Sequence, residues 1–349
     1  MNHVINSEFE KWLNTFSEID WLAAIESLAG EIHEVDRNAI RIWMRFFPLE
    51  LHRFLQNAED REEAKRRFVM DGNYELRDQI DTSHHFLYGH RYWKHVKDAV
   101  SELAGMDGGS LSDAIKAVAD RTAEKARSDR SLTLAIAAAG LMTLRQVGVE
   151  AFAASAGDTA KPKGIMSRSP DIIVAERKKD DSQGLFGFLR TVDKRFSVNW
   201  ITASDTGRFN VINDEQVASA AARDQSQNWT AKDHRCVEGV IPVECRSASC
   251  GTCWVGILGG EEKLSPVAPR ERKQVKVFGY EQPEVPNPYL RLACQARAFG
   301  NVTLVIPPWN GVFGKTVYGN VEESELSPAT TSAKRNREIV KEAVPANGE

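Results

Sequence analysis

The stretch VECRSASCGTCWVGI, residues 243–257, contains three of the five cysteines of this 349-residue chain. Four residues separate Cys245 from Cys250, and two separate Cys250 from Cys253. A fourth cysteine, Cys294, follows in the stretch RLACQARAFGNVTLVIP at 291–307. Three closely spaced thiols with a distant fourth indicate a ligand that several sulfur atoms share.

The spacing C-x4-C-x2-C with a distant fourth cysteine is that of plant-type 2Fe-2S clusters. Tetrahedral iron prefers soft thiolates, two for each iron, and a loop of this length can wrap a small anionic cluster. Backbone N–H groups along 246–252 can point at the sulfur atoms and offset their negative charge. A structural zinc site usually presents two short-spaced cysteine pairs, and a disulfide needs an oxidising compartment, so both are weaker interpretations of this pattern.

Segment 196–309 resembles plant-type 2Fe-2S ferredoxin domains in the order of its parts. Two β-type runs come first, DEQVASAAA stands where the family has its short helix, IPVECRSASCGTC stands for the cluster loop, and RLACQARAFGNVTLVIP brings the last ligand and the final strand. This resemblance covers about a third of the chain. It implies a β-grasp fold, one-electron transfer, and a 2Fe-2S cofactor ligated by Cys245, Cys250, Cys253 and Cys294.

Three features depart from the family pattern. Ala248 stands where the family commonly has glycine. Forty residues separate Cys253 from Cys294, more than in simple plant ferredoxins, and a further insertion, SQNWTAKDHRCVEG, precedes the cluster loop. The added segments are either docking surfaces or loops that tolerate extra length. Cys236 lies in that insertion, outside the ligand spacing, and we expect a free buried thiol there rather than a redox role or an alternative ligand.

Hydrophobic periodicity predicts an α+β multidomain protein, an N-terminal α-helical domain followed by a β-grasp 2Fe-2S ferredoxin domain. Residues 1–155 place apolar residues three and four apart, as helices do, in SEFEKWLNTF, DRNAIRIWMRFF, AEDREEAKRRFVM, DTSHHFLYGHRYWKHVKDAVSEL, LSDAIKAVADRTAEKA and LTLAIAAAGLMTL. Ser131 is expected to cap the last of these. Residues 156–195 bring Gly, Pro and charge runs and predict a linker or connector, and 310–349 predict a polar C-terminal tail.

Between 196 and 309 the period changes to that of strands. RFSVNWITA and GRFNVIN, joined at SDTG, predict a hairpin, and DEQVASAAARDQ predicts a short helix. CWVGIL, KQVKVFG and NVTLVIP predict further strands. Trp254, directly after Cys253, is expected either to cover the sheet edge or, if it points outward, to shield the cluster or meet a partner.

Half of the eight histidines, His84, His85, His90 and His95, lie in HHFLYGHRYWKHV and raise the question of a second metal or haem site. On one continuous helix, His84 and His95 would share a face about 16 Å apart, and His85 and His90 would lie about 140° apart around the axis. No pair has the spacing that lets one helix chelate one ion. We therefore expect polar, half-buried residues, with haem or di-iron binding as the weaker interpretation.

Charge and motifs limit the partners only broadly. The net charge is −4, and 196–309 holds equal numbers of basic and acidic residues, so long-range steering of a partner should be modest. The most apolar run, at 132–144, falls short of the roughly 20 residues that span a bilayer, and MNHVINSEFEKWLN lacks the pattern of a secretory signal, so none is expected. These features predict a cytoplasmic protein without nucleic acid or an integral membrane segment; peripheral membrane association and the oligomeric state stay open.

The chain has no G-x-G-x-x-G, P-loop or G-x-S-x-G motif, so a self-contained enzyme is not expected. The leading hypothesis is an electron carrier or electron-transfer subunit, whose helical domain docks or assembles it with a redox protein partner, either a reductase or an acceptor enzyme. Two alternatives are an electron-donating module whose helical domain carries a haem or non-haem iron centre, and a redox-sensing binding protein.

Overall fold

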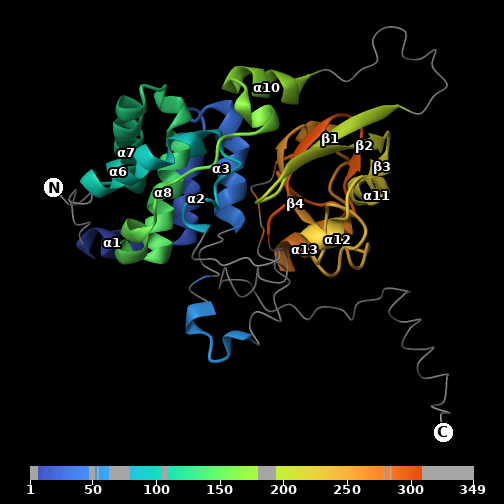
Figure 1. Ribbon diagram of the computed structural model, residues 1–349, viewed down its shortest axis with the longest axis horizontal. Coiled ribbons are helices and arrows are strands. Elements are labelled where there is room, and N and C mark those ends of the chain that lie inside the picture. The colour runs from blue at the N-terminus through green and yellow to red at the C-terminus, as the bar shows by residue number, and fades with distance from the viewer. Residues whose placement is uncertain are drawn as a thin grey trace.

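The computed structural model describes residues 7–46, 52, 55–62, 79–103, 109–179, 194–277, 280, 282 and 285–308. A helical part and a sheet part lie side by side, with helix α3 (Glu34–Phe46) facing strand β4 (Trp254–Gly259) across the boundary (Figure 1). The predicted α+β class, a helical region followed by a sheet region, is confirmed. No helix within the described ranges is long and apolar enough to cross a bilayer.

The N-terminal part packs short helices around one buried helix. Besides α3 it contains α1 (Ser7–Asn14), α2 (Glu18–Leu28), α6 (Trp93–Leu103), α7 (Leu111–Ala126), α8 (Leu134–Val147), α9 (Val149–Ala154) and the 3-10 turns η2 (Tyr88–Tyr92) and η3 (Arg130–Leu132). Helix α7 coincides with the predicted stretch LSDAIKAVADRTAEKA. Helix α8 is buried along most of its length, and a Cβ on its Gly140 would stand only 2.5 Å from the side chain of Val96 in α6. Small residues in α8 thus permit close packing of helices.

Two helix starts differ from the prediction. Helix α2 was not predicted, although Ser17 and Asp20 form a capping box ahead of it that the sequence pattern S-x-x-D signals. Ser131 does not cap α8, because Asp129 accepts a hydrogen bond from its N–H and begins the turn η3 instead. Helix α8 starts only after Thr133.

The C-terminal part is built on a five-stranded mixed sheet with the order β2-β1-β7-β4-β5. Its further strands are β1 (Arg195–Ile201), β2 (Thr206–Ile212), β5 (Leu290–Leu292) and β7 (Val302–Val305). Strands β1 and β2 form the predicted antiparallel hairpin, β1 and β7 pair in parallel, and β4 runs antiparallel to both of its neighbours. Because β5 lies beside β4, the residues after β5 return to the cysteine loop that precedes β4.

Smaller elements cover this sheet. Helix α11 (Val217–Arg223) packs on β2, after strand β3 (Glu215–Gln216), which pairs with β6 (Arg297–Ala298), and α12 (Trp229–Lys232) follows. The stretch KQVKVFG, 273–279, was predicted as a strand, but its described residues, 273–277, belong to helix α13 (Pro269–Val277). Pro269 opens this helix, and the buried residues Glu271 and Gln274 are three apart, so the period is helical and the alternation of KQVKV is misleading.

The predicted connector, 156–195, contains regular structure where it is described. It forms the turn η4 (Gly164–Ser167) and helix α10 (Pro170–Lys178), which packs against both α3 and β4. Pro170 at the first helical position is a start signal that the surrounding charge runs obscured. The predicted helix at 58–70 lies mostly outside the described residues, and the predicted tail lies wholly outside them.

The helical and sheet parts share a packed boundary. A Cβ on Gly256 of β4 would lie 2.5 Å from Cγ2 of Ile42 in α3, so this glycine lets the helix rest directly on the strand. Arg177 of α10 lies against Gly259 at the end of β4 and donates a hydrogen bond of 2.7 Å to the carbonyl of Val35. The helical part is therefore packed on the strand that follows the cysteine loop.

A buried carboxylate joins two elements of the helical part. Asp36 of α3 is fully buried and accepts hydrogen bonds from the N–H groups of Tyr88 and Gly89 in η2, at 2.5 and 2.8 Å. Burial raises the pKa of Asp36 from 3.8 to about 6, against the opposing effect of these two hydrogen bonds. The folded protein therefore binds a proton here more tightly than the unfolded chain does.

We expect Gly256→Val to destabilise the boundary between the two parts. The added side chain must displace Ile42 of α3, and overpacking of this kind costs about 1 to 3 kcal/mol. Urea unfolding followed by tryptophan fluorescence measures the loss. Gly30→Ala is the matched control, because a Cβ at Gly30 meets no atom within 4 Å. Equal stability of the two variants would contradict the packing described here.

We expect Asp36 to make the free energy of unfolding fall as pH rises from about 4 to about 6, since the folded-state pKa is the higher one. The difference between the pKa of 3.8 and the folded-state pKa of about 6 corresponds to about 3 kcal/mol in the free energy of unfolding. Above pH 6 its contribution is constant. Asp36→Asn has no such titration, so the difference between the two stability curves isolates this group; parallel curves between pH 4 and 6 would refute the assignment.

Candidate metal centre

The cysteine loop at 245–253 turns on left-handed backbone conformations. Arg246 and Ala248 have φ angles of 51° and 62°, and Gly251 has a φ of 73°. Such turns direct successive N–H groups toward one concave side, which favours a bound anion. Alanine adopts at 248 a conformation that glycine adopts at no steric cost, and the left-handed backbone costs an alanine about 1 kcal/mol.

Backbone N–H groups point at the sulfur atoms. The Sγ of Cys245 accepts from three of them, those of Ser247, Ser249 and Cys250, at N···S distances of 3.4, 3.3 and 3.3 Å. The N–H of Ala248 donates to the sulfur of Cys294, and the N–H of Cys294 donates to the sulfur of Cys253. These dipoles stabilise negative charge on sulfur, as thiolate ligands of iron require.

The four sulfur atoms form two pairs. The Cys250 thiol donates to Cys245 and, with smaller contributions from Ser249 and Ser247, lowers the pKa of Cys245 to about 3. The same contact, together with burial, raises the pKa of Cys250. In the second pair the Cys253 thiol donates to Cys294, which lowers the pKa of Cys294 and raises that of Cys253. Two pairs of thiols suit a cluster of two irons with two thiolates each.

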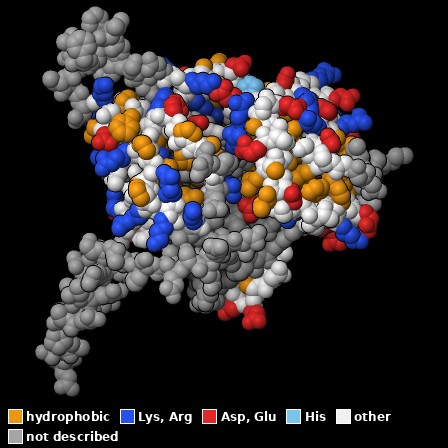
Figure 2. Space-filling model, turned by 180° about the vertical axis from the view of Figure 1, so that it is seen from behind, with side chains coloured by type: hydrophobic (Ala, Val, Ile, Leu, Met, Phe, Trp, Pro, Cys, Tyr) orange, Lys and Arg blue, Asp and Glu red, His pale blue; other side chains and the backbone are white. Residues whose placement is uncertain are grey.

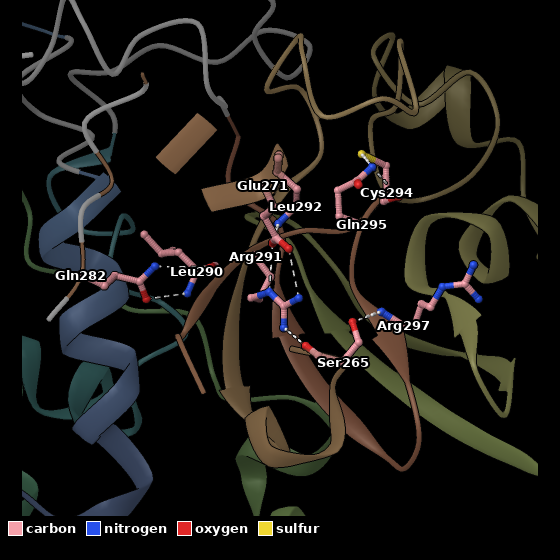
Figure 3. Close-up of polar contacts among 9 residues, drawn as sticks. All are labelled: Ser265, Glu271, Gln282, Leu290, Arg291, Leu292, Cys294, Gln295 and Arg297. Carbon is pink, nitrogen blue, oxygen red and sulfur yellow. Dashed lines mark hydrogen bonds and ion pairs between the residues drawn. The ribbon is translucent and has the colours of Figure 1, made fainter. Parts of the chain in front are cut away.

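A buried ion pair fixes the turn that carries Cys294. Arg291 of β5 donates to both carboxylate oxygens of Glu271 in α13, at 2.9 and 3.0 Å, and the N–H of Leu292 donates to the same carboxylate at 2.7 Å (Figure 3). Both charged side chains are buried. The N–H of Ala293 then donates to the carbonyl of the last cysteine in the loop, at 2.9 Å. These contacts bring the distant cysteine to the other three.

The two pairs differ in exposure. Cys245 and Cys250 are partly exposed, whereas Cys253 and Cys294 are buried. One end of the site therefore lies near the surface and the other lies against the core of the sheet part.

Two neighbours of the loop resolve alternatives left by the sequence. Cys236 is buried, as predicted, and its thiol donates to the carbonyl of Val240. Trp254 is fully buried and meets the ring of Tyr280 edge-on at 5.0 Å between centroids. It points inward, so the interpretation of Trp254 as a partner contact is wrong.

The histidines are arranged differently from the prediction. Residues 81–87 form turns, not a helix, and this brings Nδ1 of His84 within 2.8 Å of Nδ1 of His90. Both rings are buried, and burial lowers the pKa of His90 to about 3 and that of His84 well below its usual value. His85 binds the carbonyl of Thr82. His84 also lies 4.0 Å from the Trp93 ring, which suits a neutral core residue.

Among the described residues, no three His, Cys, Asp or Glu side chains are placed to hold a metal ion. The histidines near 84–95 form no such group either, within the same described ranges.

Residues 210–299 match the family model of the 2Fe-2S iron-sulfur cluster binding domain. The match includes all four cysteines and the strands β4 and β5, whereas β1 and β7 lie outside it. It confirms the predicted ferredoxin domain and the 2Fe-2S cluster as its cofactor. No curated protein and no solved structure matches the chain.

We expect Ala248→Val to lower the amount of cluster bound and Ala248→Gly to preserve it. A β-branched residue strongly disfavours a φ of 62°, and position 248 is buried. Iron and acid-labile sulfide per chain, measured after purification without air, test this. Full iron content in the valine variant would show that the left-handed turn is not needed for binding.

Proposed function

We propose that this protein transfers one electron at a time through a 2Fe-2S cluster ligated by Cys245, Cys250, Cys253 and Cys294. The observation that carries the proposal is the pairing of these sulfur atoms, each pair supplied with inward N–H groups. We assign Cys245 and Cys250 to one iron and Cys253 and Cys294 to the other, since these are the pairs already in contact. The cluster supplies a one-electron couple, with a potential on the order of −400 mV if it is of the plant type.

The chain's own residues favour fast exchange with a second protein. The partly exposed pair, Cys245 and Cys250, places one end of the site near the surface, where a partner can approach. The fixed backbone donors around Cys245 need little rearrangement when its charge changes. Burial of the other pair keeps water from that end.

We further propose that the helical part docks or assembles the ferredoxin domain with its redox partner. The boundaries are 1–155 for the helical part and 196–309 for the ferredoxin domain. Support comes from the packed boundary, in which α3 rests on β4 directly after the cluster loop. A partner bound to the helical part would thus be held at a constant distance from the cluster. The five free thiols fit a reducing compartment, and we place the protein in the cytoplasm on that ground.

The cysteine assignment is tested with Cys294→Ser. We expect loss of most of the iron, of the visible absorption and of the electron paramagnetic signal of the reduced protein, because one iron loses a thiolate. Cys236→Ser is the matched control: it also removes a buried thiol, but one outside the four, and should keep the full spectrum. Unchanged spectra in Cys294→Ser would overturn the assignment.

A further inference from the structure

The exposed charged side chains of helix α13 are all basic and point outward. Its exposed charged residues are Arg270, Arg272, Lys273 and Lys276, whereas its acidic residue, Glu271, is buried. At 100° per residue the four basic positions fill one continuous arc, opposite the buried Glu271 and Gln274. None of the four forms an ion pair with another described residue. Because 196–309 as a whole is neutral, this one-sided face is a local excess of positive charge.

This helix is held firmly against the turn that bears Cys294. The buried pair of Glu271 and Arg291 joins α13 to β5, and Glu271 also binds the N–H of Leu292, two residues before the cysteine (Figure 3). Removing either partner of such a pair leaves an uncompensated buried charge, so the contact is strongly favoured. The basic face therefore keeps a fixed position relative to the cluster.

The basic face begins at the exposed end of the site. Arg270 donates through Nη1 to the carbonyl of Ser247 in the cysteine loop, at 3.4 Å. Ser247 is also one of the residues whose N–H points at Cys245, the partly exposed cysteine. Figure 2 shows further Lys and Arg side chains spread over the sheet-bearing half of the opposite face, seen from behind.

We propose that the outward face of α13 binds an acidic surface of the redox partner and so brings that partner to the cluster edge at Cys245 and Cys250. The proposal rests on the electron-transfer function given above and names the kind of partner for it. The occupant is an acidic protein, because four unpaired cations on one rigid helix attract and orient a surface of opposite charge. Helix α13 lies in the forty-residue segment between Cys253 and Cys294, which is longer than the same segment in simple plant ferredoxins.

The test compares two one-electron acceptors, acidic cytochrome b5 and basic cytochrome c, mixed with the reduced holoprotein in a stopped-flow instrument. One electron leaves the reduced cluster and converts one ferric haem to ferrous haem, without proton transfer or bond change. We expect a faster second-order reaction with the acidic acceptor than its driving force alone predicts. This rate should fall as ionic strength rises from about 0.01 to about 0.15 M, since the Debye length shortens from about 30 to about 8 Å.

The double variant Arg272→Glu/Lys273→Glu should slow reduction of the acidic acceptor by about 10-fold or more at low salt and should speed reduction of the basic one. The control Lys194→Glu/Arg195→Glu makes the same change in net charge at exposed positions at the start of β1, in the ferredoxin part but far from α13 in Figure 1, and should leave both rates near the wild-type values.

The outcomes separate this proposal from the one on which it rests. Iron content and visible absorption are measured on every sample first, so a protein without cluster refutes the electron-transfer function. Suppose instead that the cluster is present and both acceptors are reduced. Equal effects of the two double variants, or no effect of either, would then refute docking at α13 but not the electron-transfer function.

Discussion

The site depends on hydrogen bonds from backbone N–H groups to the cysteine sulfur atoms. These bonds stabilise negative charge on the sulfur atoms of the loop at 245–253. The loop contributes few charged side chains toward the cysteines, and its N–H groups supply the favourable field instead. That arrangement requires left-handed backbone at Arg246 and Ala248, which a free chain would rarely adopt. The surrounding sheet and the turn after β5 hold these strained positions in place, and ligation of the cluster adds to that support.

The helical part and the ferredoxin part are connected through the same strand. Strand β4 leaves the cysteine loop, passes under α3 at Gly256 and ends against Arg177 of α10. On the same face of the strand Trp254 packs on Tyr280, which in turn meets the ring of Phe46 in α3 at 6.3 Å between centroids. The chain therefore combines a cluster domain with a helical body through apolar packing, and the segment between them is itself partly folded.

Much of the site could be predicted from the sequence, and the reasons are local. Cysteine spacing reflects the geometry of the ligand, so it predicted without knowledge of the fold a 2Fe-2S domain, which the family match at 210–299 confirms. The hairpin of β1 and β2 and the helix α7 follow from period and punctuation alone. The arrangement of backbone donors around Cys245 depends on φ angles at residues such as Ala248, which the residue type did not signal.

The errors arose where tertiary contacts override local pattern. KQVKV alternates like a strand, but burial of Glu271 against Arg291 requires a helix there. The turns at 81–87 interrupt a helical period because the buried carboxylate of Asp36 binds the N–H groups of Tyr88 and Gly89. In both places a charged group in the core, which periodicity treats as a surface residue, determines the local conformation.

The contact between Ile42 and Gly256 limits how this protein could have arisen and how it can diversify. The face of β4 that α3 covers is apolar, and its exposure to water would be unfavourable. Recombination that moved the cluster-bearing half into another gene would have to carry α3 with it or replace that face with polar residues. The two halves are therefore joined by apolar packing as well as by the chain that connects them.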